Sequence, residues 1–236
     1  MRQTFVKLIG IQRFATFAQL RFEAGAWARG LEAGCAVLAR LQDAYLRRTW
    51  WPCAMDASGF SILVDSAYSA GLRAGDSIDV IGPVGRGFRV ADLTRRLLLI
   101  ATESNAPAPA IAPLLPLIAR ALASNREVTL AYAIPEDMRA YPLSALPPAL
   151  EVIGVEGEDL LPHLGDALAW ADQIFCCGSR EWTQRVSAHV ARMRLRTRPE
   201  FMQVLNMLDL PCGLGVCRAC WNGSRLACVA GPVFDA

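Results

Sequence analysis

The chain is nearly devoid of lysine and histidine. Among its 236 residues, 24 are basic, and all of these are arginines except Lys7. A phosphate-binding P-loop and Schiff-base chemistry both need a lysine side chain, so either could exist only at this position. The two histidines, His163 and His189, lie far in the sequence from the cysteines, and we expect both at the surface or in packing. Scarce lysine beside abundant arginine is typical of a bias in genome composition.

A strong charge of one sign and a long apolar run are missing as well. The net charge is +2, which excludes a strong positive field of the kind that attracts nucleic acids or acidic lipids. The most apolar stretch, residues 106–119, contains four prolines and is too short to cross a bilayer as a helix. The N-terminus lacks an apolar core followed by a cleavage site. We therefore expect a cytoplasmic protein with no nucleic-acid partner and no membrane partner.

Apolar residues are plentiful, and their rhythm changes along the chain. The chain is 53% hydrophobic and 19% charged, which excludes a disordered protein. Its length fits one large domain or two to three small ones. Residues 1–93 contain short β-branched or alternating runs between turn signals, which predict a small antiparallel β-barrel. The predicted strands cover residues 4–10, 15–23, 35–41, 59–65 and 77–81.

Residues 94–198 alternate between apolar runs and segments with helical periodicity. The run at residues 96–101 is continuous, as in strands that are buried on both faces. The alternation predicts a parallel α/β layer. Further strands are expected at residues 127–133, 150–155 and 173–177, and helices at 114–124, 158–170 and 180–194. Residues 199–236 follow as a small cysteine-rich domain, so the predicted fold class is a multi-domain β plus α/β protein.

Eight cysteines divide into two groups of four. In a reducing compartment, clustered cysteines indicate metal or redox chemistry rather than disulfides. Four of them have the spacing C-x4-C-x2-C-x7-C near the C-terminus, and the first three match the plant-type [2Fe–2S] ligand spacing. These four predicted ligands are Cys212, Cys217, Cys220 and Cys228. Gly213 and Gly215 allow a tight loop whose amides can approach the sulfurs, and Asn222-Gly223 predicts a hairpin before the last ligand.

Other interpretations of the cysteines stay open. A structural zinc site usually pairs cysteines as two C-x2-C units, and only one such unit exists here. Cys35 and Cys53 are expected to be buried free thiols. Cys176 and Cys177 are neighbours in a predicted strand, so their side chains should point to opposite faces, one into the core and Cys177 into the cleft between domains.

Several segments resemble the electron-transfer subunit of two-subunit, NAD-linked dihydroorotate dehydrogenase. The cysteine loop and the ending Gly-Pro-Val-Phe-Asp at residues 231–235 are the most specific. Residues 72–88 resemble the family's end-of-barrel segment, residues 110–115 the start of its nicotinamide-domain helix, and Cys177-Gly178 its Cys-Gly-Pro motif. The resemblance covers nearly the whole chain, including the order of its parts.

The resemblance implies a fold and a role for each part. Residues 1–93 would be an FAD-binding-type barrel, residues 94–198 a Rossmann-like nucleotide-binding domain of the ferredoxin-reductase type, and residues 199–236 the [2Fe–2S] domain. The family passes electrons between an FMN-bearing catalytic subunit and NAD by way of its cluster and FAD. The implied partner is therefore a catalytic flavoprotein subunit in a hetero-oligomer, and the implied cofactors are the [2Fe–2S] cluster, FAD and NAD.

The flavin motifs of the family are altered in this sequence. Its Arg-Pro-x-Ser corresponds to residues 47–52, where Arg48 can take the arginine role and Trp51 replaces the serine. Its Gly-Lys-Gly-Thr corresponds to residues 65–68, where Asp65 is unfavourable beside a pyrophosphate. The implied flavin contacts are Arg48, Thr49, Trp50, Ser66 and Tyr68, and Gly178 is the implied nicotinamide contact.

The nicotinamide side departs further from the family. The loop after the first α/β strand, residues 102–109, has no glycine, and its prolines lack backbone donors. Glu103 in this loop would repel an anion. Three functions follow as hypotheses: electron transfer between a flavin-bearing partner and a nicotinamide, a cluster-bearing interaction subunit that no longer binds nicotinamide, and a structural zinc protein on a reductase scaffold.

Overall fold

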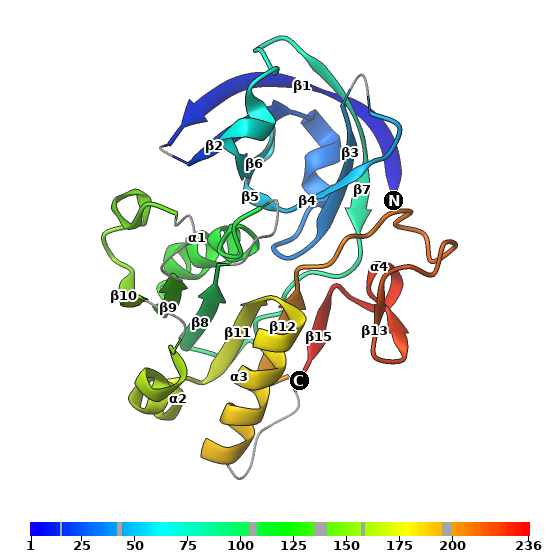
Figure 1. Ribbon diagram of the computed structural model, residues 1–236. Coiled ribbons are helices and arrows are strands. Elements are labelled where there is room, and N and C mark those ends of the chain that lie inside the picture. Colours follow the sequence, from blue (N-terminus) through cyan, green and yellow to red (C-terminus); the bar gives the residue numbers. More distant parts are fainter. Residues whose placement is uncertain (15, 42–43, 104–107, 135–140, 157–158, 195–199) are drawn as a thin grey trace.

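The computed structural model describes residues 1–14, 16–41, 44–103, 108–134, 141–156, 159–194 and 200–236 (Figure 1). Its first part is a seven-stranded antiparallel sheet in the order β4-β3-β7-β1-β2-β6-β5. The edge strands β4 and β5 are joined by Trp51 alone, so the sheet curls into a nearly closed barrel. The strands are β1 (Arg2–Arg13), β2 (Phe17–Glu23), β3 (Ala36–Arg40), β4 (Arg48–Trp50), β5 (Pro52–Met55), β6 (Gly59–Asp65) and β7 (Ser77–Val84).

Every second side chain along the strands points into the barrel and fills its interior. In β1, Val6 and Leu8 are buried, whereas Phe5 and Lys7, which alternate with them, face outward. All five predicted barrel strands are present. The short strands β4 and β5 were not foreseen, because three or four residues around a proline carry too little alternation to be recognised.

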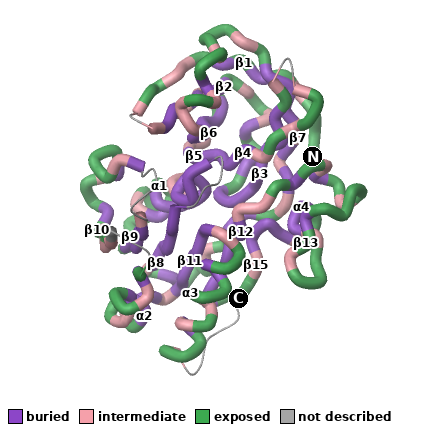
Figure 2. Tube along the Cα trace, in the orientation of Figure 1, coloured by how far each residue is buried: buried purple, intermediate pink, exposed green. Residues whose placement is uncertain are grey.

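The second part is a six-stranded sheet in the order β10-β9-β8-β11-β12-β15. The first five strands are parallel, and β15 pairs antiparallel with β12. Its strands are β8 (Arg96–Thr102), β9 (Glu127–Ile134), β10 (Glu151–Glu156), β11 (Gln173–Gly178), β12 (Met202–Asn206) and β15 (Val233–Asp235). Helix α1 (Leu115–Ala123) packs on one face, and α2 (Gly165–Trp170) and α3 (Arg180–Met193) pack on the other. Figure 2 shows β8 and β11 buried between these layers.

The predicted α/β elements are confirmed with one adjustment. The helix expected at residues 158–170 is a 3-10 turn followed by the short α2, and Pro162 lies in that turn. The 3-10 segments are η1 (Gly25–Gly30), η2 (Ser66–Ser69), η3 (Ala112–Leu114), η4 (Leu143–Ala145) and η5 (Leu161–Leu164). No helix among the described residues is long and apolar enough to cross a membrane.

The last part of the chain contributes two strands to the α/β sheet. Strands β12 and β15 both come from residues 199–236, the stretch that was expected to form a separate domain. Between them lie the cysteine loop, the hairpin β13 (Trp221–Asn222) and β14 (Arg225–Leu226), and α4 (Ala227–Ala230). The predicted hairpin at Asn222-Gly223 is thus confirmed, with Gly223 at φ +60°. The cysteines are therefore carried on an insertion between two strands of the sheet.

The barrel and the C-terminus meet at Gly85. The Arg86 amide donates to the Gly231 carbonyl over 2.6 Å. Gly85 has φ +78°, and a Cβ there would lie 2.2 Å from Pro232 Cδ. Only glycine fits both the backbone conformation and the close approach.

We expect Gly85→Ala to lower the free energy of unfolding by about 2–4 kcal/mol, because the methyl group forces the two segments apart. Gly75→Ala is the matched control, since Gly75 has φ +104° with open space around it, and should cost about 1–2 kcal/mol. Urea denaturation measures both values. Equal losses would show that the contact with Pro232 is unimportant.

Candidate functional site

The cysteine loop is pinned to the barrel at its start. The Leu210 amide donates to the Thr49 hydroxyl of β4 over 2.8 Å. Gly213 has φ +66° and lies so close to the barrel that a Cβ would be 2.8 Å from Leu38 Cδ1. Gly215 is also left-handed, at φ +77°. The expectation that these two glycines adopt conformations closed to other residues is confirmed.

The loop brings cysteine sulfurs and backbone amides together. The Sγ atoms of Cys220 and Cys228 are 3.2 Å apart, and both side chains are buried. The Gly215 amide donates to Cys228 Sγ over 3.2 Å. The amides of Leu214 and Cys217 donate to Cys212 Sγ over 3.5 and 3.4 Å. The loop amides therefore point at sulfur, as they do around thiolates that carry negative charge.

The two ends of the loop differ in their acid–base properties. The amides of Cys217 and Leu214 lower the pKa of the Cys212 thiol to about 6, because they stabilise its thiolate. Burial, followed by the neighbouring Cys220, raises the pKa of Cys228 to about 12. Cys212 also contributes to that rise, so the first and last cysteines lie within electrostatic range of each other.

The donor chemistry of the four cysteines fits an iron–sulfur cluster or zinc, while their arrangement is not closed around an ion. Within the described ranges, no group of three or more His, Cys, Asp or Glu side chains is gathered tightly enough to hold a metal ion. Cys220 and Cys228 touch, Cys212 is bonded to its own loop, and Cys217 is exposed. Four thiols on a glycine-containing loop are the ligand type that both [2Fe–2S] clusters and zinc use.

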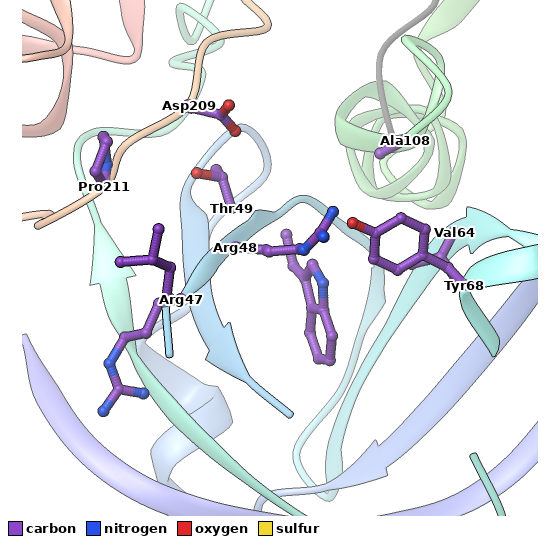
Figure 3. A pocket seen from close by; sticks show the side chains of 10 residues that line it. Arg47, Arg48, Thr49, Val64, Tyr68, Ala108, Asp209 and Pro211 are labelled. Carbon is purple, nitrogen blue, oxygen red and sulfur yellow. The ribbon is translucent and has the colours of Figure 1, made fainter. Parts of the chain in front are cut away.

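A cavity of about 300 Å³ lies beside the start of this loop (Figure 3). Four of the predicted flavin contacts line it together, namely Arg48, Thr49, Trp50 and Tyr68. The sequence did not point to Val64, Ala108, Asp209 or Pro211, which complete the wall from other segments. Nothing local in the sequence marks these residues, because only the folded chain brings their segments to one place.

Arg48 and Tyr68 contact each other at the wall of the cavity (Figure 3). The Arg48 guanidinium carbon lies 4.3 Å from the centre of the Tyr68 ring, whereas Arg47 turns toward Asp79 and bonds its carboxylate over 2.6 Å. The buried Tyr68 hydroxyl has no hydrogen-bond partner within the part of the chain that the structure describes. An unpaired buried hydroxyl costs about 1–3 kcal/mol, which a polar ligand in the cavity would recover.

The remaining predicted flavin contacts are placed differently. Ser66 does not line the cavity, although its buried hydroxyl also lacks a partner among the described residues. The Thr49 hydroxyl is already used by Leu210. Trp50 stacks on Phe22 in the barrel interior, with ring centres 5.5 Å apart, and only part of it reaches the cavity. Trp51 points the other way, into the core between the barrel and the sheet.

Gly178 is separate from this cavity, at the end of β11. A Cβ on it would lie 2.7 Å from the ring of Trp182, so the indole packs directly on its backbone. The indole N–H is buried and unpaired among the residues described. The expectation that Cys177 lines a cleft is wrong: Cys176 and Cys177 do point to opposite faces, but both are fully buried. Burial raises the pKa of both thiols, because both faces of the sheet are covered.

Glu103 lies at the end of β8 with its carboxylate buried. Only 4% of the residue is exposed. The Tyr132 hydroxyl donates to Oε1 over 2.5 Å, and the Ala110 amide donates to Oε2 over 2.9 Å. Burial raises the pKa of Glu103 to about 7 despite these hydrogen bonds. The loop residues 104–107 that were expected to affect nucleotide binding lie outside the described residues.

Solved structures of other proteins share the barrel and α/β architecture of this chain. A chain of the NADH-dependent reduced ferredoxin–NADP oxidoreductase, studied for flavin-based electron bifurcation, matches with a TM-score of 0.77 at 18% identity, over 98% of this chain and 88% of that one. A ferredoxin reductase of carbazole 1,9a-dioxygenase matches with a TM-score of 0.71 at 12% identity, over 88% and 70% of the two chains. The chain has the ferredoxin-reductase fold.

The fold extends across several kinds of reductase. The cytochrome b5 reductase domain of Ulva prolifera nitrate reductase matches with a TM-score of 0.67 at 14% identity, over 86% of this chain and 97% of that one. In a self-sufficient cytochrome P450 monooxygenase the match spans 28% of that much longer chain. No protein-family profile and no curated protein sequence matches this chain.

Glu103 should make stability fall as the pH rises. Its pKa is about 7 in the folded chain, against 4.5 ordinarily, so folding favours the protonated form. The resulting stabilisation is complete below about pH 4.5 and is lost as the pH rises through 7, a change of about 3 kcal/mol.

Glu103→Gln keeps the size of the side chain and removes the titration. We expect the difference in unfolding free energy between wild type and variant to shift by about 2.5 kcal/mol between pH 5 and pH 8 in urea denaturation. The same difference at both pH values would contradict a raised pKa at this carboxyl group.

Proposed function

We propose that this chain is an electron-transfer subunit that holds a [2Fe–2S] cluster on its cysteine loop and a flavin in the neighbouring cavity. The proposal is supported above all by the position of the cavity directly beside the cysteine loop. Asp209 and Pro211 line the cavity, and the first cysteine, Cys212, follows directly. A protein that relays electrons must hold its redox groups close together and keep them in place.

The four loop cysteines would be the cluster ligands. Cys212, Cys217, Cys220 and Cys228 supply the thiolates, and the amides of Leu214, Gly215 and Cys217 already donate to sulfur. Such hydrogen bonds favour the reduced, more negative form of a sulfur-ligated centre and so raise its potential. Closing the set requires the Cys220–Cys228 pair and the Cys212 end to approach one another around the cluster.

The cavity residues would hold the flavin. Arg48 is the cation available to a pyrophosphate, and the Tyr68 hydroxyl is an unpaired donor at the same wall. Asp65, which the sequence placed as an unfavourable charge, instead turns its carboxylate back onto the Ala67 amide over 2.8 Å. When bound, a flavin exchanges electrons singly or in pairs, and a cluster exchanges them singly.

A catalytic flavoprotein subunit, as in dihydroorotate dehydrogenase, would dock on the cysteine loop. Large apolar side chains that are exposed surround the ligands there, with Val216 78% exposed. The set consists of Leu214, Val216, Trp221 and Val229. Exposed apolar residues gathered around one loop are typical of a protein interface, and this loop also carries the redox ligands.

Cofactor content tests the proposal directly. The protein purified under anaerobic conditions should contain iron and sulfide in equal amounts and show the EPR signal of a reduced [2Fe–2S] cluster. Cys220→Ser should lose most of the iron, because it removes a buried ligand. Cys35→Ala is the control, since Cys35 is buried elsewhere, and should retain it. Zinc without iron would favour the structural zinc protein instead.

Flavin retention tests the cavity. We expect Arg48→Ala to weaken flavin binding by about 10–100-fold and Tyr68→Phe by about 5–10-fold, through loss of a charged and a neutral hydrogen bond. Arg120→Ala, on the exposed side of α1, should leave binding unchanged. Fluorescence titration of the apoprotein with FAD gives the three constants. Equal affinity of Arg48→Ala and wild type would place the flavin elsewhere.

The docking surface can be tested without disturbing the ligands. Val216→Asp should weaken association with the catalytic subunit by about 10-fold or more while iron content stays constant, because it puts a charge in an apolar contact. Met193→Asp, at the far end of α3, is the control with a similarly exposed apolar side chain. Unchanged association of Val216→Asp, measured by analytical ultracentrifugation, would move the interface to another face.

A further inference from the structure

The crevice that open α/β sheets use for nucleotides is clearly located in this chain. From β8 the chain runs outward to β9 and β10, then returns to β11 and β12 on the other side. Strand order thus reverses between β8 and β11, and ligands bind outside the carboxyl ends of the strands at such a point. Glu103 follows the end of β8, and Gly178 ends β11, so both lie at this crevice.

Glu103 occupies the position of an anion in this crevice. Its carboxylate accepts hydrogen bonds from the Ala110 amide and the Tyr132 hydroxyl, and the nearby Ile111 amide also acts to lower its pKa. These amides belong to the turn that leads into η3 and α1, the place where a nucleotide phosphate meets backbone donors in such folds. Pro109, immediately before, has no N–H to offer a second anion.

The carboxylate is also held from behind. Tyr132 is fully buried, and its hydroxyl accepts the Tyr141 amide over 3.0 Å while it donates to Glu103. The Glu103 amide donates to the Ala133 carbonyl of β9 over 3.2 Å. Both the backbone and the side chain of Glu103 are therefore tied to β9, and displacing the carboxylate would leave buried donors unpaired.

The β11 side of the crevice is filled by Trp182. Its ring lies against the backbone of Gly178, and the Thr102 methyl group lies 3.2 Å from the position of a Cβ on the same glycine. The Trp182 amide is capped by the Ser179 hydroxyl, which fixes the first turn of α3. Trp182 is only 6% exposed, so its ring occupies the space beside the backbone of Gly178.

We propose that the nucleotide crevice of this chain is closed by its own side chains, Glu103 in place of a phosphate and Trp182 over the end of β11, so that the chain binds neither NAD(H) nor NADP(H). The residues present do not fit a nicotinamide nucleotide. The proposal rests on the proposed function and extends it by excluding a nicotinamide as the second redox partner.

Direct binding to the wild-type chain tests the closure. NADH and NADPH are titrated separately into the purified full-length protein, with protein-to-nucleotide energy transfer and equilibrium dialysis as readouts. We expect no saturable binding with a Kd below about 1 mM, which corresponds to about 4 kcal/mol. Saturable binding of either nucleotide below that limit overturns the proposal. The measurement needs no loaded cofactor, so it remains decisive even if iron, sulfide and flavin analysis refutes the proposed function.

A variant pair tests the role of the Glu103 carboxylate. Glu103→Ala leaves the Ala110 and Ile111 amides around a small space that formate can fill, so formate should raise its Tm saturably, by about 2–4 °C. Glu103→Gln fills the same space and should show no such rise, and neither should wild type. Equal effects of formate on all three proteins overturn the assignment of the Glu103 carboxyl group to the place of a bound anion. If Glu103→Ala does not fold, nucleotide binding by wild type decides the question.

Discussion

One apolar core joins the barrel to the α/β sheet, and it positions both the cavity at Arg48 and the cysteine loop. Buried side chains of β3, β5, β6 and β7 meet those of α1 and of one face of β8, β9 and β11 in a continuous cluster. Leu210, Cys220 and Cys228 of the C-terminal insertion belong to the same cluster. Each large apolar side chain in it contributes about 1.5–3 kcal/mol, so the three parts of the chain are held in one arrangement. The cavity and the cysteine loop therefore keep a constant relation to each other.

The close packing explains why small residues recur at the junctions. Gly85 admits Pro232, Gly213 admits Leu38, and Gly178 admits Trp182, each at a distance that a Cβ would not tolerate. The first two contacts join segments that are distant in the sequence, whereas the third packs the first turn of α3 onto the end of β11. Glycine is used here for backbone approach between parts of the molecule, and at Gly85 and Gly213 also for a left-handed conformation. Close packing of this kind also fills the crevice between β8 and β11, while the cavity at Arg48 stays open.

Buried polar groups distinguish the open cavity at Arg48 from the filled crevice between β8 and β11. At the cavity, the Tyr68 hydroxyl is unpaired among the described residues, and the Arg48 guanidinium lies over the Tyr68 ring. At the crevice, the Glu103 carboxylate is satisfied by an amide and a hydroxyl. Unsatisfied groups favour a ligand, and satisfied ones resist it, because a ligand must replace the hydrogen bonds that it breaks. The contrast holds for Tyr68 and Glu103; the Trp182 indole N–H at the crevice is itself unpaired among the described residues, and the packing of its ring on Gly178 fills that side.

The sequence by itself determined the kind of elements and the thiol groups that the tail offers. Long alternating or continuous apolar runs, such as those of β6 and β8, predicted their strands, because burial of one or both faces leaves a local pattern. The spacing of the four cysteines and the need for glycine at 213 and 215 were equally local. Only the tertiary structure decided that residues 199–236 add two strands to the sheet, that Cys177 is buried, and that Glu103 meets Tyr132 and Ala110. These outcomes depend on contacts between segments far apart in the chain, for which no local pattern exists.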